Sequence, residues 1–163
     1  MWNPDLLKDR RVLVTAGADG IGLRIASAFH AAGARVLVCD VQQAALDRLA
    51  DTRPGLLGVR ADVAAEDDVA ELFRAVDRQL GGLDVLVNNA GVAGPTGGIE
   101  TLSLADWERT LAVNLTGQFL CVRQAVPRLR QGLRPSIVNL ASAAGHLGLS
   151  LIHISEPTRQ AEI

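Results

Sequence analysis

Short apolar segments alternate with longer helical patterns along this chain, and this alternation restricts the possible folds more than any other feature. The apolar segments, rich in Val, Leu and Ile, are 11–15, 35–39, 56–60, 84–87 and 136–140. Helical patterns lie between them at 21–32, 42–50, 66–80 and 104–129, the last with a possible kink at Pro127. Strands that are apolar almost throughout are typical of a sheet covered by helices on both faces. The sequence therefore predicts one doubly wound α/β unit with five parallel strands in a three-layer αβα arrangement.

The composition of the 163-residue chain fits one globular domain and excludes several functional classes. The formal net charge of −2 is too close to zero for a nucleic-acid-binding surface. No apolar run approaches the ~20 residues of a membrane-spanning helix, and residues 1–11 contain no apolar core of a secretory signal. Cys39 and Cys121 lie inside apolar segments, which predicts two buried, reduced thiols and a cytoplasmic protein. The three histidines lack the spacing of metal ligands, so we expect no metal site.

A glycine-rich segment, Thr15–Gly22 (TAGADGIG), follows the first predicted strand and opens the first predicted helix. Glycines at this point let the backbone turn tightly and approach a pyrophosphate, which the helix N-terminus attracts. Asp40 follows the second predicted strand, where a carboxylate binds a ribose diol and repels a 2′-phosphate. No basic residue stands beside Asp40 or inside the glycine segment. We therefore expect a dinucleotide site that prefers NAD to NADP; the alternative is that Asp40 is a solvated loop carboxylate or an N-cap.

The glycine segment resembles the cofactor loop of the short-chain dehydrogenase/reductase family, and further motifs follow in the family's order. These are Asp62–Val63, Asn88–Gly91 (NNAG), Asn114 in LAVNLTG and Ser142 in IVNLASAAG. The resemblance covers residues 11–148 and implies a Rossmann fold. It implies that the cofactor is bound by Thr15, Gly17, Asp19, Gly20, Ile21, Gly22, Asp40, Asp62, Val63, Asn89, Ala90 and Gly91. Ala16 stands where the family has its first glycine, and we expect the turn to tolerate it.

Each motif residue also has a purely structural interpretation. Asn88 and Asn89 have the donors and acceptors to satisfy backbone groups between adjacent strands. Asn114 is equally a polar residue hydrogen-bonded to its own helix, and Ser142 an ordinary loop serine. The ordered combination, rather than any single residue, favours the family.

The resemblance implies hydride transfer between a nicotinamide and a carbonyl or alcohol carbon. It implies that Asn114 helps to order a water in the catalytic site and that Ser142 binds the substrate carbonyl. The family also uses a tyrosine as general acid–base and a lysine four residues later. Its usual interval from Ser142 leads to positions that hold Ser155 and Arg159. The chain contains no tyrosine, and its only lysine is Lys8.

Residues 149–163 (LSLIHISEPTRQAEI) differ in character from the preceding chain. They lack its richness in alanine, glycine and arginine and show no helical apolar period. Residues 149–159 resemble one reading-frame translation of a common transposase-based sequencing adapter. We therefore expect 1–148 to be an incomplete domain of the family, carrying its N-terminal five strands, and 149–163 to be a non-native tail. The alternative is a genuine but divergent C-terminus.

Three functions are compatible with the sequence. The first is an NAD(H)-dependent oxidoreductase acting on a small-molecule carbonyl or alcohol such as a 3-oxoacyl, sugar or small-alcohol substrate, of which this chain is an inactive fragment. The second is a non-catalytic dinucleotide-binding module or pseudoenzyme. The third is an interaction protein that uses the helix 104–129, although a core-facing stripe explains that helix equally well. The resemblance implies a homodimer or homotetramer, and the sequence does not identify the substrate.

Overall fold

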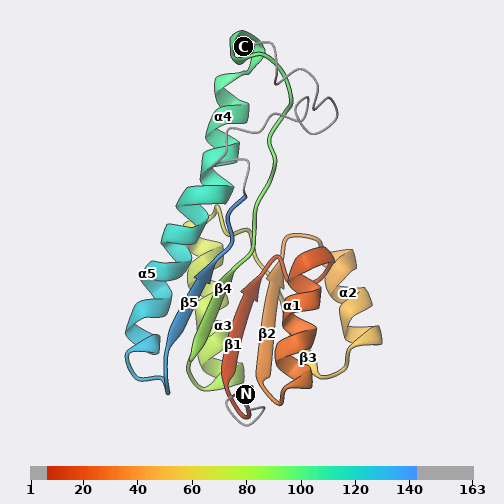
Figure 1. Ribbon diagram of the computed structural model, residues 1–163, viewed down its shortest axis with the longest axis vertical. Coiled ribbons are helices and arrows are strands. Elements are labelled where there is room, and N and C mark those ends of the chain that lie inside the picture. The colour runs from red at the N-terminus through yellow and green to blue at the C-terminus, as the bar shows by residue number, and fades with distance from the viewer. Residues whose placement is uncertain (1–6, 143–163) are drawn as a thin grey trace, which may run out of the picture.

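The computed structural model describes residues 7–142 and contains a five-stranded parallel sheet (Figure 1). The strands are β1 (Arg11–Thr15), β2 (Arg35–Asp40), β3 (Leu56–Arg60), β4 (Val85–Asn88) and β5 (Ser136–Asn139). The α-helices are α1 (Gly20–Ala31), α2 (Gln43–Thr52), α3 (Glu66–Leu80), α4 (Leu104–Leu111) and α5 (Gly117–Leu129). Each predicted strand and helix is present, with ends that shift by one or two residues. The doubly wound α/β architecture is therefore confirmed.

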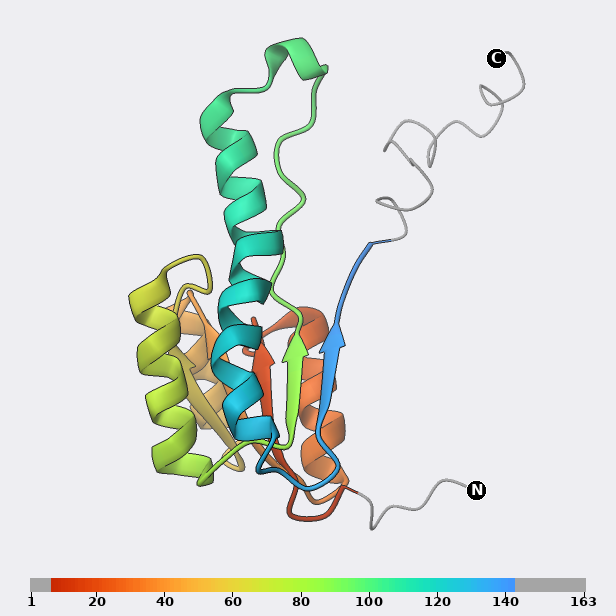
Figure 2. The ribbon, with the colours of Figure 1, turned by 90° about the vertical axis from the view of Figure 1, so that its left-hand side faces the viewer.

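The strands lie in the order β3-β2-β1-β4-β5, with helices on both faces of the sheet. Figure 2 shows α3 and α5 on one face and α1 on the other. Alternate strand residues contribute to two separate cores, because successive side chains in a strand point to opposite faces. Leu13, Leu37 and Leu86 pack toward α3 and α5, whereas Val12 and Val36 pack toward α1 and α2. This double burial explains why the strands are apolar throughout.

The ends of the helices on both faces follow capping rules that the sequence shows. The Asp19 side chain accepts a hydrogen bond from the backbone N–H of Gly20 and so caps α1. The chain leaves α1 through Gly33 and α3 through Gly81, whose φ angles of +87° and +75° favour glycine. The Asp19 cap fixes the start of α1 at Gly20, shortly after β1 ends at Thr15.

The long helix predicted over 104–129 consists of three segments in direct succession. A π-helical turn, η3 (Ala112–Thr116), separates α4 from α5, and Pro127 lies inside α5, which continues to Leu129. A short 3-10 helix, η2 (Ile99–Thr101), precedes them. In Figure 1, α4 extends beyond the carboxyl ends of the strands. The sequence pattern predicts the length of this helix but does not predict its π turn.

Cys39 and Cys121 are buried and free, as predicted. Burial raises the pKa of both thiols, that of Cys121 to about 12, so both stay protonated at neutral pH. None of the helices within residues 7–142 is long and apolar enough to span a membrane. The proposed non-native tail 149–163, with Ser155 and Arg159, lies outside the described residues.

Candidate functional site

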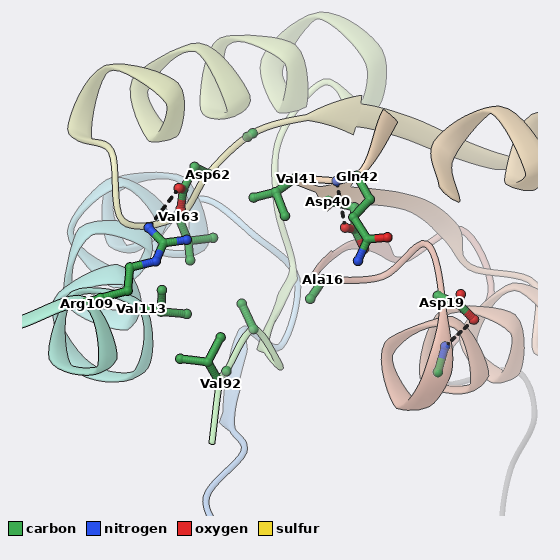
Figure 3. A pocket seen from close by; sticks show the side chains of 14 residues that line it. Ala16, Asp19, Asp40, Val41, Gln42, Asp62, Val63, Val92, Arg109 and Val113 are labelled. Carbon is green, nitrogen blue, oxygen red and sulfur yellow. Dashed lines mark hydrogen bonds and ion pairs between the residues drawn. The ribbon is translucent and has the colours of Figure 1, made fainter. Parts of the chain in front are cut away.

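A cleft of about 420 Å³ opens at the carboxyl edge of the sheet. It lies where the chain leaves β1, β2, β3 and β4, beside the point at which β1 has β2 on one side and β4 on the other. Open α/β sheets bind ligands at this kind of switch point. The residues that line the cleft, shown in Figure 3, are Ala16, Asp19, Gly20, Asp40, Val41, Gln42, Ala61, Asp62, Val63, Ala90, Gly91, Val92, Arg109 and Val113.

The glycine segment forms one wall of this cleft, and two of its glycines are required by close packing. A Cβ on Gly22 would lie 2.1 Å from the carbonyl oxygen of Ala16, and one on Gly17 would lie 2.6 Å from Cβ of Val38. At Gly20, which lines the cleft, the same position faces open space. The segment therefore packs its backbone against β2 and leaves room for a ligand at the N-terminus of α1.

Ala16 occupies a backbone conformation that favours glycine. Its φ angle is +48°, in the left-handed region where a Cβ is strained. The segment lies between β1 and α1 with Ala16 in this conformation, which it adopts at a cost that glycine would not incur; tolerance of the turn stays a prediction.

Thr15 and Asn89 connect the ends of β1 and β4 behind the cleft. The Thr15 hydroxyl oxygen accepts hydrogen bonds from the backbone N–H groups of Asn89 and Ala90, each at 3.0 Å. The Asn89 amide donates to the carbonyl oxygens of Thr15 and Ala16 at 2.9 and 3.0 Å. Neither Thr15 nor Asn89 lines the cleft, so both act on its shape by holding the glycine segment.

Asn88 lies deeper, in β4, and its amide donates to the side-chain oxygen of Asn139 in β5 at 2.8 Å. The side-chain oxygen of Asn88 is buried and has no hydrogen-bond partner among residues 7–142. The side chains of Asn88 and Asn139 therefore join β4 to β5. The structural interpretation, which expected bonds to backbone groups, fits the bonds of Asn89 and not this side-chain contact of Asn88.

Asp40 lies in the cleft next to the glycine segment and is only 8% exposed. One carboxylate oxygen accepts the backbone N–H of Ala18 at 3.3 Å, and the other accepts that of Gln42 at 3.1 Å. The alternative interpretations of Asp40 are therefore wrong, because it is neither solvated nor the N-cap of α2, which is Gln42. It is held between β2 and the glycine segment.

Two arginines reach the carboxylates of the cleft from distant parts of the chain. Arg109 of α4 donates to Asp62 at 3.2 Å, and Arg48 of α2 donates to Asp19 at 3.3 Å. Figure 3 shows Arg109 and Asp62 facing one another on one side of the cleft. The sequence analysis missed both arginines, since they lie 47 and 29 residues from their partners and no local spacing signals the contacts.

Asn114 lies within the π turn, and its side chain contacts the segment that follows β4. Its amide nitrogen donates to the carbonyl oxygen of Val92, and its amide oxygen accepts the N–H of Val92. A Cβ on Gly91 would lie 3.2 Å from the same amide oxygen. The interpretation of Asn114 as tied only to its own helix is therefore wrong. Ser142, three residues after the end of β5, is exposed at the same edge of the sheet.

Of the other residues that the resemblance implied for the cofactor, Asp62, Val63, Ala90 and Gly91 line the cleft with Asp19, Gly20 and Asp40. Gly17 and Gly22 lie behind it, and Ile21 is 68% exposed outside it. Within the described residues, no group of three or more histidine, cysteine, aspartate or glutamate side chains is placed to hold a metal ion. The site offers backbone amides, carboxylates, apolar side chains and the guanidinium of Arg109.

The strand order, the glycine segment at the switch point and the acidic residue that ends β2 define a Rossmann-type α/β fold. A sequence model of the family described as short chain dehydrogenase matches residues 10–154. The chain therefore belongs to the short-chain dehydrogenase/reductase family.

The chain is similar to several oxidoreductases. It is 38% identical over 147 residues to an uncharacterized oxidoreductase of Mycobacterium bovis, covering 88% of this chain and 59% of that protein. It is 39% identical over 147 residues to a D-threitol dehydrogenase of Mycolicibacterium smegmatis, covering 88% and 56%. A crystal structure of a short-chain dehydrogenase/reductase, a glucose/ribitol dehydrogenase from Brucella melitensis, matches with a TM-score of 0.81 and 33% identity, covering 88% and 61%. The chain thus spans less than two thirds of the length of these proteins.

Proposed function

We propose that this chain is the cofactor-binding part of an NAD(H)-dependent oxidoreductase that interconverts a carbonyl and a secondary alcohol. The observation that carries the proposal is the placement of Asp40 in the cleft, hydrogen-bonded to Ala18 of the glycine segment. A carboxylate here accepts hydrogen bonds from a ribose diol and repels a 2′-phosphate, which favours NAD over NADP.

The residues of the cleft fit such a dinucleotide. Open space at Gly20 and the N-terminus of α1 suit the pyrophosphate. Asp62 and Val63 suit the adenine, one as hydrogen-bond acceptor and the other as apolar contact, while Ala90 and Gly91 line the opposite end. When bound, the nicotinamide supplies the carbon that accepts or donates the hydride.

The chain's own residues orient the reacting groups. We assign to Ser142 a hydrogen bond to the substrate carbonyl and to Asn114 the ordering of a water. Both polar atoms of the Asn114 side chain bind Val92. We therefore propose that a main-chain group of the π turn binds the water, because the regular helical hydrogen bonds are interrupted there. The chain contains no tyrosine to act as general acid–base, so we propose that it binds NAD without turnover.

For the substrate we propose a small secondary alcohol or its carbonyl counterpart. Two relatives carry names of this kind, D-threitol dehydrogenase and the cis-4-hydroxycyclohexanecarboxylate dehydrogenase of Sinomonas cyclohexanicum, which is 38% identical over 143 residues. We also propose that residues 149–163 are a non-native tail. Two buried free thiols support a cytoplasmic location.

We further propose that the protein is a homo-oligomer formed through α4 and α5. Large apolar side chains lie exposed at helical spacing along these segments, namely Leu104, Trp107, Leu111, Leu115 and Phe119. Leu115→Glu should convert the oligomer to a monomer in analytical ultracentrifugation. Leu133→Glu, an equally exposed leucine outside the stripe, is the control; dissociation by both variants, or by neither, contradicts this interface.

The cofactor preference is tested by calorimetric titration of the chain with NAD+ and NADP+. We expect tighter binding of NAD+, and Asp40→Asn should reduce the preference by about tenfold, since it removes the charge and keeps a hydrogen-bond acceptor. Asp47→Asn, on the exposed side of α2, should change neither affinity. Tighter binding of NADP+ by the unaltered chain would refute the role of Asp40.

A non-catalytic dinucleotide-binding module is the second candidate, favoured by the absence of tyrosine from the chain. The coding DNA after codon 148 separates the two. A Tyr-x-x-x-Lys motif at the native locus supports the oxidoreductase, whereas native DNA that encodes LIHISEPTR supports the module.

A further inference from the structure

Of the described residues that line the cleft, Arg109 is the one that is basic, and nothing in the sequence pattern assigns it a role. It lies on α4, four residues before Val113, so the two side chains share a face of the helical segment. Val113 is buried, with 6% of its surface exposed, whereas the side chain of Arg109 is 57% exposed. Arg109 therefore lies nearer the solvent than Val113 on the same side of the cleft.

The carboxylate of Asp62 holds the Arg109 guanidinium at one side of the cleft. One oxygen of Asp62 accepts from Arg109 at 3.2 Å, and the other accepts the backbone N–H of Ala64 at 2.9 Å. Because the bond to Ala64 fixes the carboxylate, the ion pair joins the segment after β3 to α4 at one side of the cleft (Figure 3).

The space next to this ion pair suits a flat ring. Val63, Val92 and Val113 line it with apolar side chains, and Arg109 adds a planar cation at its outer end. A guanidinium stacks on aromatic faces, and the contact is worth about 1 kcal/mol when partly exposed. The other charged side chains of the cleft are the carboxylates of Asp19, Asp40 and Asp62. Arg109 therefore supplies the side-chain positive charge that the described part of the cleft presents to an anionic nucleotide.

We propose that Arg109 is a positioning residue for the cofactor: held by Asp62, its guanidinium covers the adenine ring and closes that end of the cleft. This inference rests on the proposed binding of a dinucleotide and adds a residue outside the motifs that suggested it. Because Arg109 belongs to α4, adenine binding would depend on where α4 lies. The π turn that carries Asn114 follows α4 directly.

The test is calorimetric titration of the full chain with NAD+, AMP and nicotinamide mononucleotide. Arg109→Ala should weaken the binding of NAD+ and AMP by about fivefold and leave that of nicotinamide mononucleotide unchanged. Arg109→Lys should recover only part of the loss, because lysine restores charge without a planar group. The loss should persist at 0.5 M NaCl, where long-range attraction is screened.

Arg123→Ala is the matched control. Arg123 of α5 forms an exposed ion pair with Glu66 at the start of α3, so it also connects the helical segment to the β3 side, but it does not line the cleft. Equal affinities of Arg109→Ala and Arg123→Ala for AMP would overturn the inference while leaving the proposed function intact. Failure of the unaltered chain to bind either NAD+ or AMP would overturn both. If Arg109→Ala does not fold, the affinity of Arg109→Lys for AMP is the test. An affinity equal to that of the unaltered chain would overturn the stacking role of Arg109.

Discussion

Asn114 is bonded through both ends of its side-chain amide to the backbone of Val92, each hydrogen bond being 2.8 Å long. The amide thus imitates the edge of a neighbouring strand and fixes the chain that leaves β4 against the π turn between α4 and α5. This contact sets one wall of the cleft. A side chain at position 91 would be crowded, because a Cβ on Gly91 would lie 3.2 Å from the Asn114 amide oxygen.

Asn114→Ala should lower the free energy of unfolding by about 2 kcal/mol, since it removes two hydrogen bonds of about 1 kcal/mol each. Asn114→Asp keeps the acceptor for the Val92 N–H but places an oxygen against the Val92 carbonyl, so it should not restore stability. Urea denaturation followed by circular dichroism measures both. Loss below 0.5 kcal/mol in both variants would mean that Val92 is held by other contacts.

Ala16→Gly should stabilise the chain by about 0.5–1 kcal/mol, because glycine adopts a φ of +48° without the strain of a Cβ. The gain is smaller than the strain itself, since glycine also increases the entropy of the unfolded chain. Ala18→Gly is the control: Ala18 is buried and has no positive φ, so the same change should destabilise. Thermal melts should therefore shift in opposite directions.

Asp84 should make stability depend on pH in acid. Its carboxylate accepts two bonds from the Arg11 guanidinium, at 2.9 and 2.8 Å, and backbone bonds from Arg11 and Leu133. These bonds, led by that of the guanidinium, hold the pKa of Asp84 well below its usual value of 3.8. Since the folded pKa is the lower one, the stabilisation is present above about pH 4 and is lost as the pH falls below it.

Asp84→Asn should cost about 3 kcal/mol at pH 7 and flatten the loss of stability between pH 4 and pH 2. Asp77→Asn removes the partner of Arg128 at an exposed site and should cost less than about 1 kcal/mol. Denaturation in urea at pH 7, 4 and 2 compares them. If the free energy of unfolding of Asp84→Asn still falls as steeply between pH 4 and pH 2, other carboxyl groups cause the pH dependence.

The β5 strand should make the chain associate at high concentration. All four of its residues are exposed, and in the described part of the chain β5 pairs only with β4. Exposed strand edges template pairing with other chains. Val138→Lys should therefore reduce light scattering on concentration, whereas Leu133→Lys, the same change outside the strand, should not. Equal scattering in both variants would show that net charge, rather than the strand edge, governs association.

The sequence predicted most of the fold from short-range patterns. Short continuous apolar segments located the strands, helical periodicity located the helices, and the glycine segment located the cleft, because turn chemistry depends on neighbouring residues. Asp40 could be placed as well, since the carboxyl ends of parallel strands meet at one edge of the sheet.

Only the tertiary structure decided the details that shape the cleft. The contacts of Arg109 with Asp62 and of Arg48 with Asp19 join residues far apart in the sequence, and they depend on how the helical layers pack. The same is true of the π turn that presents Asn114 to Val92. The left-handed conformation of Ala16 is set by the turn between β1 and α1 against its own local preference. Local physics thus determined which elements form, whereas packing between layers determined which charges meet.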